Sequence, residues 1–198
     1  MAISLESCGG LILAGGGSRR MGQCKALLQV GDTTMLERIA RQMEAFSERW
    51  LSTNDPALGL TFSGEVVADV FTGKGPLAGI HAALRKAGKP YLFCVACDMP
   101  FFSRQVIAPM LEAFPNGADA LVCQDSTGRI HPLCGIYAKT ALPALTRCLQ
   151  SGELRVQSLL EQLDCAYFQT AGHFSDQILW NINTPEAYNS LREEGLLS

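Results

Sequence analysis

The sequence predicts a three-layer α/β fold, in which a mostly parallel sheet carries helices on both faces. Short apolar runs that fit strands alternate along the chain with segments whose apolar residues recur at helical spacing. Several of the runs are apolar throughout, as expected of parallel strands that are buried on both faces. Glycine-rich or polar residues directly follow several runs, and sheets of this kind bind ligands outside the carboxyl ends of their strands.

The first half of the chain predicts strands and helices in alternation. Short apolar runs predict strands at residues 11–14, 49–53 and 66–69. Helical spacing predicts a helix over residues 34–46, with Thr33 or Thr34 as its N-cap. Residues 73–79 are glycine-rich and predict a loop, and residues 80–87 predict the helix that follows it.

The second half repeats the alternation. Residues 91–97 form an apolar run that fits a central strand buried on both faces, and Ser103 is expected to cap a helix that ends near residue 114. Two further runs predict strands at 118–123 and 135–137. Helices are expected at 141–150 and 156–163, and Thr184 and Pro185 predict the start of a last one.

Composition narrows the possible functions. With 198 residues, 47% hydrophobic and 18% charged, the chain is expected to form one domain over residues 1–198. A net charge of −3 argues against nucleic acid as a partner. No apolar run reaches the ~18 residues of a membrane span. The first ten residues lack the positive charge of a secretory signal, and the eight cysteines show no disulfide framework, so we expect a cytoplasmic protein.

The strongest local signal is a glycine-rich loop. Gly15, Gly16 and Gly17 follow the first strand, so the backbone can approach a ligand and its amides can bind phosphate oxygens. Arg20 and Lys25 add positive charge to the same segment. The spacing matches neither the P-loop nor the dinucleotide fingerprint, so the loop indicates a phosphate site of another class.

Three polar residues come shortly after other predicted strands. Asn54, Asp69 and Asp98 are therefore expected to meet the glycine loop at one edge of the sheet. A carboxylate at the end of a buried strand is costly unless it is solvated, paired or bound to metal. Because magnesium prefers one or two carboxylates together with phosphate oxygens, Asp98 is a candidate Mg²⁺ ligand.

Five short segments together resemble one family. The glycine loop is similar to the signature of Rossmann-like nucleotidyltransferases, and the set of segments resembles the molybdenum cofactor guanylyltransferases. The resemblance extends in order from about residue 8 to residue 192 and rests on segments 13–25 (LAGGGSRRMGQCK), 75–79 (GPLAG), 97–101 (CDMPF), 131–137 (HPLCGIY) and 181–186 (NINTPE).

The resemblance implies a reaction and assigns residues to it. Such enzymes transfer GMP from GTP to the terminal phosphate of molybdopterin-bound molybdenum cofactor and release pyrophosphate, and they work beside proteins that make the cofactor and deliver it. The catalytic residues implied are Arg20, Lys25 and Asp98, the last as the Mg²⁺ ligand. The nucleotide-binding residues implied are Leu13, Ala14, Gly15, Gly16, Lys25, Asn54, Asp69 and Asp98. The residues implied on the pterin side are Gly79, His131, Asn181 and Asn183.

One departure and two rival functions remain open. Family members commonly carry an acidic residue before the loop lysine, where this chain has Cys24. A cytidylyltransferase for the same cofactor, or another sugar- or alcohol-phosphate nucleotidyltransferase, would share the loop, although segment 75–79 favours guanylyl transfer. A non-catalytic cofactor-delivery module is the rival from a different class. Cys94 and Cys97 form a Cys-x-x-Cys, but residues three apart in a strand face opposite ways, so a disulfide is not expected.

Overall fold

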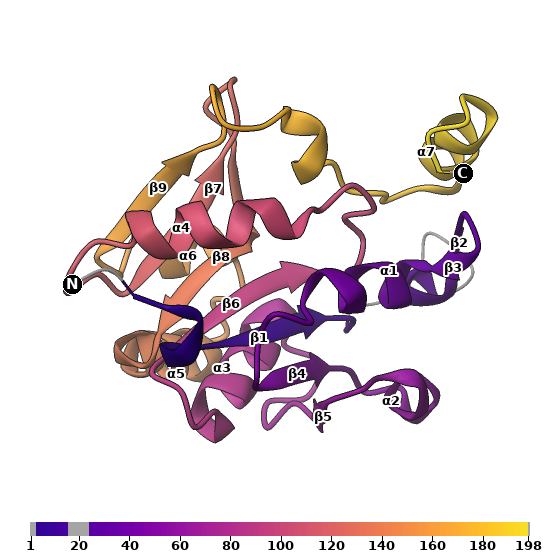
Figure 1. The fold of residues 1–198 in the computed structure, drawn as a ribbon. Coiled ribbons are helices and arrows are strands. Elements are labelled where there is room, and N and C mark those ends of the chain that lie inside the picture. The colour runs from indigo at the N-terminus through magenta and orange to yellow at the C-terminus, as the bar shows by residue number, and fades with distance from the viewer. Residues whose placement is uncertain (1–2, 16–23, 198) are drawn as a thin grey trace.

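The computed structural model describes residues 3–15 and 24–197 (Figure 1). Within this part of the chain, seven strands form one sheet in the order β5-β4-β1-β6-β8-β7-β9. Only β8 among them runs antiparallel to its neighbours, so the predicted mostly parallel sheet is confirmed. The bounds are β1 Cys8–Leu13, β4 Arg49–Ser52, β5 Glu65–Val67, β6 Tyr91–Ala96, β7 Ala120–Gln124, β8 Ile130–Ala138 and β9 Cys165–Gln169.

Helices cover both faces of this sheet, as predicted. One face packs against α1, α2 and α4, and the other packs against α3, α5 and α6. Successive residues of a strand alternate between the faces, so that Phe93 of β6 joins the first core and Cys94 joins the second. The helices are α1 Met35–Gln42, α2 Pro56–Thr61, α3 Pro76–Lys86, α4 Ile107–Ala113, α5 Leu142–Ser151, α6 Val156–Leu160 and α7 Pro185–Glu193.

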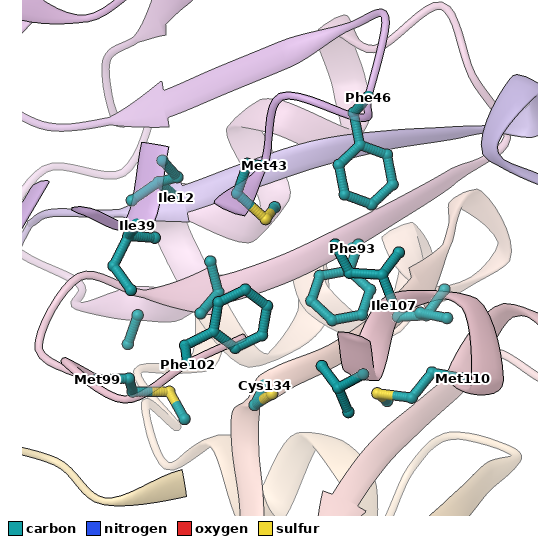
Figure 2. Close-up of a cluster of buried hydrophobic side chains, with 14 of the residues drawn as sticks. Ile12, Ile39, Met43, Phe46, Phe93, Met99, Phe102, Ile107, Met110 and Cys134 are labelled. Atoms are coloured by element: carbon teal, nitrogen blue, oxygen red, sulfur yellow. The ribbon is translucent and has the colours of Figure 1, made fainter. Parts of the chain in front are cut away.

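Aromatic rings fill the centre of the first core. Phe93 lies between Phe46 and Phe102 (Figure 2). The centroid of the Phe93 ring is 5.8 Å from that of Phe46 and 5.9 Å from that of Phe102. All three rings are buried, and tilted pairs at this separation add to the stability that their apolar area provides. This packing covers one face of β6, which also pairs with β1 on one side and with β8 on the other.

Helix caps agree with three sequence predictions. The hydroxyl of Thr34 accepts a hydrogen bond from Glu37 N, and the Glu37 side chain accepts one from Thr34 N, which forms a capping box. Ser103 caps the 3-10 helix Arg104–Val106 that leads into α4, and Thr184 caps α7. The N-cap of α1 is therefore Thr34 and not Thr33.

The structure corrects several predicted boundaries. Helix α3 begins at Pro76 rather than at residue 80, because proline fits the first turn and Gly75 adopts a φ of 68° just before it. Strand β8 begins at Ile130, well before the predicted 135–137, although it includes a proline. Helix α2, strand β9 and the hairpin of β2 (Gln29–Val30) and β3 (Thr33–Thr34) were not predicted.

The carboxyl-terminal helix packs against the β2–β3 hairpin rather than against the sheet. The hydroxyl of Tyr188 donates to Gln29 O at 2.8 Å, and Gly31 N donates to Leu197 O at 2.6 Å. A small third core holds this pair together. Figure 1 places both elements beyond the end of the sheet toward which β1 and β6 point. The segment before α7 therefore passes over the carboxyl edge of the sheet.

A buried histidine in α3 gives a prediction about pH. His81 is 2% exposed, and its Nε2 lies 3.2 Å from Thr146 Oγ1, which already donates its hydrogen to Leu142 O. Nε2 must therefore carry the proton, while Nδ1 is buried and has no partner among the described residues. Burial, followed by the nearby charge of Arg85, lowers the pKa of His81.

We expect the free energy of unfolding to fall as the pH drops below about 6.5, the ordinary pKa of histidine. The unfolded chain binds the proton first, so the stability that neutral His81 provides is present above that pH and is lost below it. In His81→Gln, an uncharged amide can still donate to Thr146. The free energy of unfolding of this variant should depend less steeply on pH, with a slope smaller by at most about 1.4 kcal/mol per pH unit. Urea unfolding at stepped pH measures both proteins, and equal slopes would contradict this account.

Candidate functional site

The carboxyl ends of four parallel strands meet at one edge of the sheet. Leu13 of β1 pairs with Ser52 of β4 on one side and with Ala96 of β6 on the other, and Ser52 pairs with Val67 of β5. The strands thus end in register. The residues that follow them, Asn54, Asp69, Asp98 and the start of the glycine loop, are brought to the same edge. This predicted convergence is confirmed.

A pocket of about 200 Å³, here called the loop pocket, opens at this edge. Of the predicted nucleotide-binding residues, Leu13, Ala14, Gly15, Lys25 and Asp98 line it. Gly16 and Arg20 lie outside the described residues. The full lining is Leu13, Ala14, Gly15, Cys24, Lys25, Ala26, Pro76, Ala96, Cys97, Asp98 and Leu133.

Asn54 and Asp69 pair with each other rather than lining the loop pocket. The Asn54 amide Nδ2 donates to Asp69 Oδ2 at 3.2 Å. Burial raises the pKa of Asp69, and hydrogen bonds from Asn54 and Ser52 partly offset this. The pair presents an amide and a carboxylate, which are groups that bind hydroxyls and base edges. Their predicted contact with nucleotide stays a prediction.

Lys25 connects two distant parts of the chain. Its Nζ donates to Asp98 Oδ2 at 3.1 Å and to Asn183 Oδ1 at 2.7 Å. The backbone supports the same arrangement, since Ile182 N donates to Asp98 O at 2.9 Å. The contact joins residues 158 positions apart in sequence and closes the carboxyl-terminal segment onto the loop pocket.

Asp98 suits a cation. Its Oδ1 is buried and makes no hydrogen bond to the described residues, and a buried carboxylate oxygen without a partner is costly. No group of three or more His, Cys, Asp or Glu residues that could hold a metal occurs within 3–15 and 24–197. Mg²⁺ at Asp98 would be expected to complete its coordination with water and with phosphate oxygens of a substrate. Mg²⁺ commonly binds in this way, with few protein ligands and with phosphate oxygens and water completing its coordination.

A second pocket of about 460 Å³, here called the distal pocket, adjoins the first through Asn183. His131, Asn181 and Asn183, three of the four residues predicted on the pterin side, line it. Sequence reasoning missed Asp125, Arg129 and Trp180. Asp125 directly follows β7 and so carries the same signal as Asp98, which could have identified it. The full lining is Asp125, Arg129, His131, Leu179, Trp180, Asn181, Asn183, Ala187, Ser190 and Leu191.

The fourth predicted residue, Gly79, lies elsewhere. It is buried within α3 and lines neither pocket. A Cβ at this position would meet Ser52 Oγ and would lie 2.8 Å from Leu13 Cδ2. The prediction of a loop over 73–79 is therefore wrong at Gly79. The glycine allows α3 to approach the ends of β1 and β4 closely.

We expect Gly79→Val to destabilise the protein by about 2 kcal/mol or more. Replacing a helical glycine recovers at most about 1 kcal/mol of helix propensity, whereas overpacking of a well-packed core costs about 1–3 kcal/mol, and here even the first methyl group does not fit. Gly88→Ala is the control, because Gly88 lies outside the helix and its Cβ would contact a single atom, Glu48 Oε2, at 3.1 Å. Urea unfolding measures both variants, and similar midpoints would contradict the close packing.

The cysteine pair behaves as small apolar residues. Cys94 and Cys97 pack into different cores on opposite faces of the sheet, as predicted. Burial raises the pKa of Cys97 to about 12 and that of Cys94 still further. Cys24, which stands where an acidic residue was expected, lines the loop pocket beside Lys25.

Comparison with known proteins identifies the family. Residues 10–166 match the family model described as a MobA-like NTP transferase domain. The chain belongs to the MobA-like NTP transferase family. It is therefore a nucleotidyltransferase.

Individual relatives of this NTP transferase cover most of its length. It is 40% identical over 148 residues to the probable molybdenum cofactor guanylyltransferase of Pelotomaculum thermopropionicum, covering 74% of this chain and 71% of that one. It is 32% identical to the molybdenum cofactor guanylyltransferase of Desulfosudis oleivorans, covering 92% and 93%. Its fold matches the crystal structure of molybdopterin-guanine dinucleotide biosynthesis protein A from Archaeoglobus fulgidus with a TM-score of 0.82 at 27% identity, covering 95% and 98%. Within its described residues, no helix has the length and apolar character needed to cross a bilayer.

Proposed function

We propose that this chain transfers GMP from GTP to the terminal phosphate of molybdopterin-bound molybdenum cofactor. The observation that carries the proposal is the position of Lys25, which hydrogen-bonds to Asp98 in the loop pocket and to Asn183 in the distal pocket. A transferase for two substrates needs adjoining sites with positive charge between them, because the phosphates that react repel each other. The names of the relatives and the order of the five segments support guanylyl transfer in particular.

In this proposal GTP occupies the loop pocket and the pterin occupies the distal pocket. An oxygen of the acceptor phosphate attacks the α-phosphorus of GTP, the bond to the β-phosphate oxygen breaks, and pyrophosphate leaves. The attacking oxygen is already ionised, so no general base is required. The protein contributes mainly positioning and charge stabilisation.

Each charged residue then has a role. Lys25 neutralises charge on the phosphates at the junction of the pockets, and Arg20 is proposed to act on the same triphosphate. Asp98 would hold Mg²⁺, which when bound supplies further positive charge to the phosphates. Asn54 and Asp69 are proposed to bind the nucleoside, and Asn181 and Asn183 the pterin side.

The cysteine thiols indicate the cellular compartment in which the proposed reaction takes place. All eight cysteines are free, and most are buried, which fits a reducing compartment. We therefore place the reaction in the cytoplasm, where proteins of cofactor synthesis and delivery would supply the acceptor and take the product.

A calorimetric panel tests the nucleotide. We expect GTP to bind in the presence of Mg²⁺ more tightly than CTP, ATP or UTP. A preference for CTP would overturn guanylyl transfer in favour of a cytidylyltransferase of the same fold. Pyrophosphate release from GTP on addition of molybdenum cofactor tests the reaction itself. Nucleotide binding without release would indicate a delivery module instead of an enzyme.

A further inference from the structure

The distal pocket has an aromatic wall that the reaction chemistry does not explain. Trp180 lines the pocket and leaves 49% of its surface exposed, which is unusual for so large an apolar side chain. Phe101 holds the indole from the side, with ring centroids 6.1 Å apart and planes at 82°. An indole that is supported at one side and open to a pocket can stack on a planar ring.

The same pocket has a charged end. His131 Nε2 lies 2.9 Å from Asp125 Oδ2, and both side chains are 12% exposed. The other oxygen of Asp125 accepts hydrogen bonds from Thr127 N, Thr127 Oγ1 and Arg129 N at 2.9, 2.6 and 3.0 Å. The β7–β8 turn is thus folded around the Asp125 carboxylate. The contact with His131, more than any other, holds the pKa of this carboxylate well below its usual range. That carboxylate fixes the orientation of the imidazole.

A second carboxylate ties the two ends together. Asp176 accepts hydrogen bonds from Ser126 N at 3.2 Å and from the Ser126 hydroxyl, both on the β7–β8 turn, and from Thr170 Oγ1 at 3.0 Å. Asp176 begins the 3-10 helix Asp176–Leu179, and Trp180 follows that helix directly. The turn that carries Asp125 and the segment that carries Trp180 are therefore held in a fixed relation.

Resting on the proposed function, we propose that the distal pocket selects its acceptor by two features, a planar heteroaromatic ring that stacks on Trp180 and an anionic phosphate ester that binds His131. Asp125 is the positioning residue that aims His131, and Arg129, exposed on the same lining, adds positive charge to this end. A sugar phosphate offers the anion without the ring, and a neutral pterin offers the ring without the anion. Each lacks one half of the recognition.

The two tryptophans of the chain make the ring contact measurable. Trp50 is 4% exposed in the second core, and Trp180 is 49% exposed in the pocket. In Trp50→Phe, the fluorescence therefore reports on Trp180 alone. In Trp180→Phe it reports on Trp50, and this variant also measures the light that the ligand itself absorbs. Thermal unfolding of both variants checks that each remains folded.

The experiment titrates these variants with a fluorescent pterin that carries a phosphate ester on its side chain, with the same pterin lacking the phosphate, and with glycerol phosphate. We expect saturable quenching of Trp180 by the pterin phosphate, binding roughly tenfold weaker for each partial ligand, and no quenching of Trp50 beyond absorption. Pterin anisotropy measures binding independently of the tryptophans. Binding of the pterin phosphate without quenching of Trp180 would overturn the aromatic wall.

Asp125→Asn tests the charged end. We expect this variant to bind the two pterins with nearly equal affinity, because only the contribution of the phosphate is lost, and to bind GTP as the wild type does. If Asp125 were merely structural, the variant would bind both pterins and GTP more weakly. That result would overturn the positioning role. If GTP binds with Mg²⁺ but no pterin does, or if GTP itself quenches Trp180, this inference is wrong while the nucleotide half of the proposed function stands. If GTP does not bind at all, the proposed function fails first.

Discussion

Asp98→Asn is expected to lower the rate of pyrophosphate release by about 10²–10³-fold, a loss of roughly 2.7–4 kcal/mol by analogy with removal of one oxyanion donor. The substitution keeps the shape of the side chain and leaves one oxygen to accept from Lys25 Nζ, which is 3.1 Å away. It removes the negative charge and fills the position of the buried, unpartnered Oδ1 with either an amide nitrogen or an uncharged oxygen. Rates measured over a series of Mg²⁺ concentrations should show a weaker dependence on the metal.

Asp164→Asn is the matched control for that change. Asp164 is an exposed carboxylate just before β9, at the opposite edge of the sheet from the site, so its loss should leave turnover unchanged. Circular dichroism and thermal unfolding check that both variants remain folded. Normal turnover in a folded Asp98→Asn protein, with the usual response to Mg²⁺, would disprove the metal assignment.

Elements with a strong local pattern could be predicted from the sequence. Strand β6 is apolar throughout because it lies at the centre of the sheet, and the eight residues of α1 carry an apolar stripe directly after the N-cap Thr34. Strand β9 and the β2–β3 hairpin could not be predicted, because they are short and partly exposed and depend on distant partners. β9 pairs with β7, and the hairpin packs against α7, more than 100 residues away. Gly79 was misplaced because a glycine in a helix is recognised only from the neighbour it touches.

The part of the candidate site that lies at the ends of the parallel strands could be predicted from the sequence. Asp98, Asn54 and Asp69 follow parallel strands, and the topology brings such positions together whatever else the chain does. The distal pocket was harder to predict from the sequence, because its lining comes from the β7–β8 turn and from the segment before α7. No spacing in the sequence reveals that Asp176 ties these two segments together, or that Trp180 stays half exposed between them.

Lys25→Met is expected to weaken GTP binding by roughly tenfold and to lower turnover by about 10²–10³-fold. Methionine retains most of the side-chain length and volume but removes the ammonium group that reaches Asp98 and Asn183. Lys86→Met is the matched control, since Lys86 is an exposed cation at the end of α3.

Combining Lys25→Met with Asn183→Ala tests whether the lysine joins the two pockets. If Asn183 acts partly by holding Lys25, the double variant should lose less turnover than the product of the two single losses, because the shared contact is removed only once. Independent sites would instead give losses that multiply. Calorimetry with GTP separates the two residues further, since the proposal places Lys25 at the triphosphate and Asn183 on the acceptor side. Multiplying losses, or unchanged GTP affinity in Lys25→Met, would contradict a shared junction at which the two substrates meet.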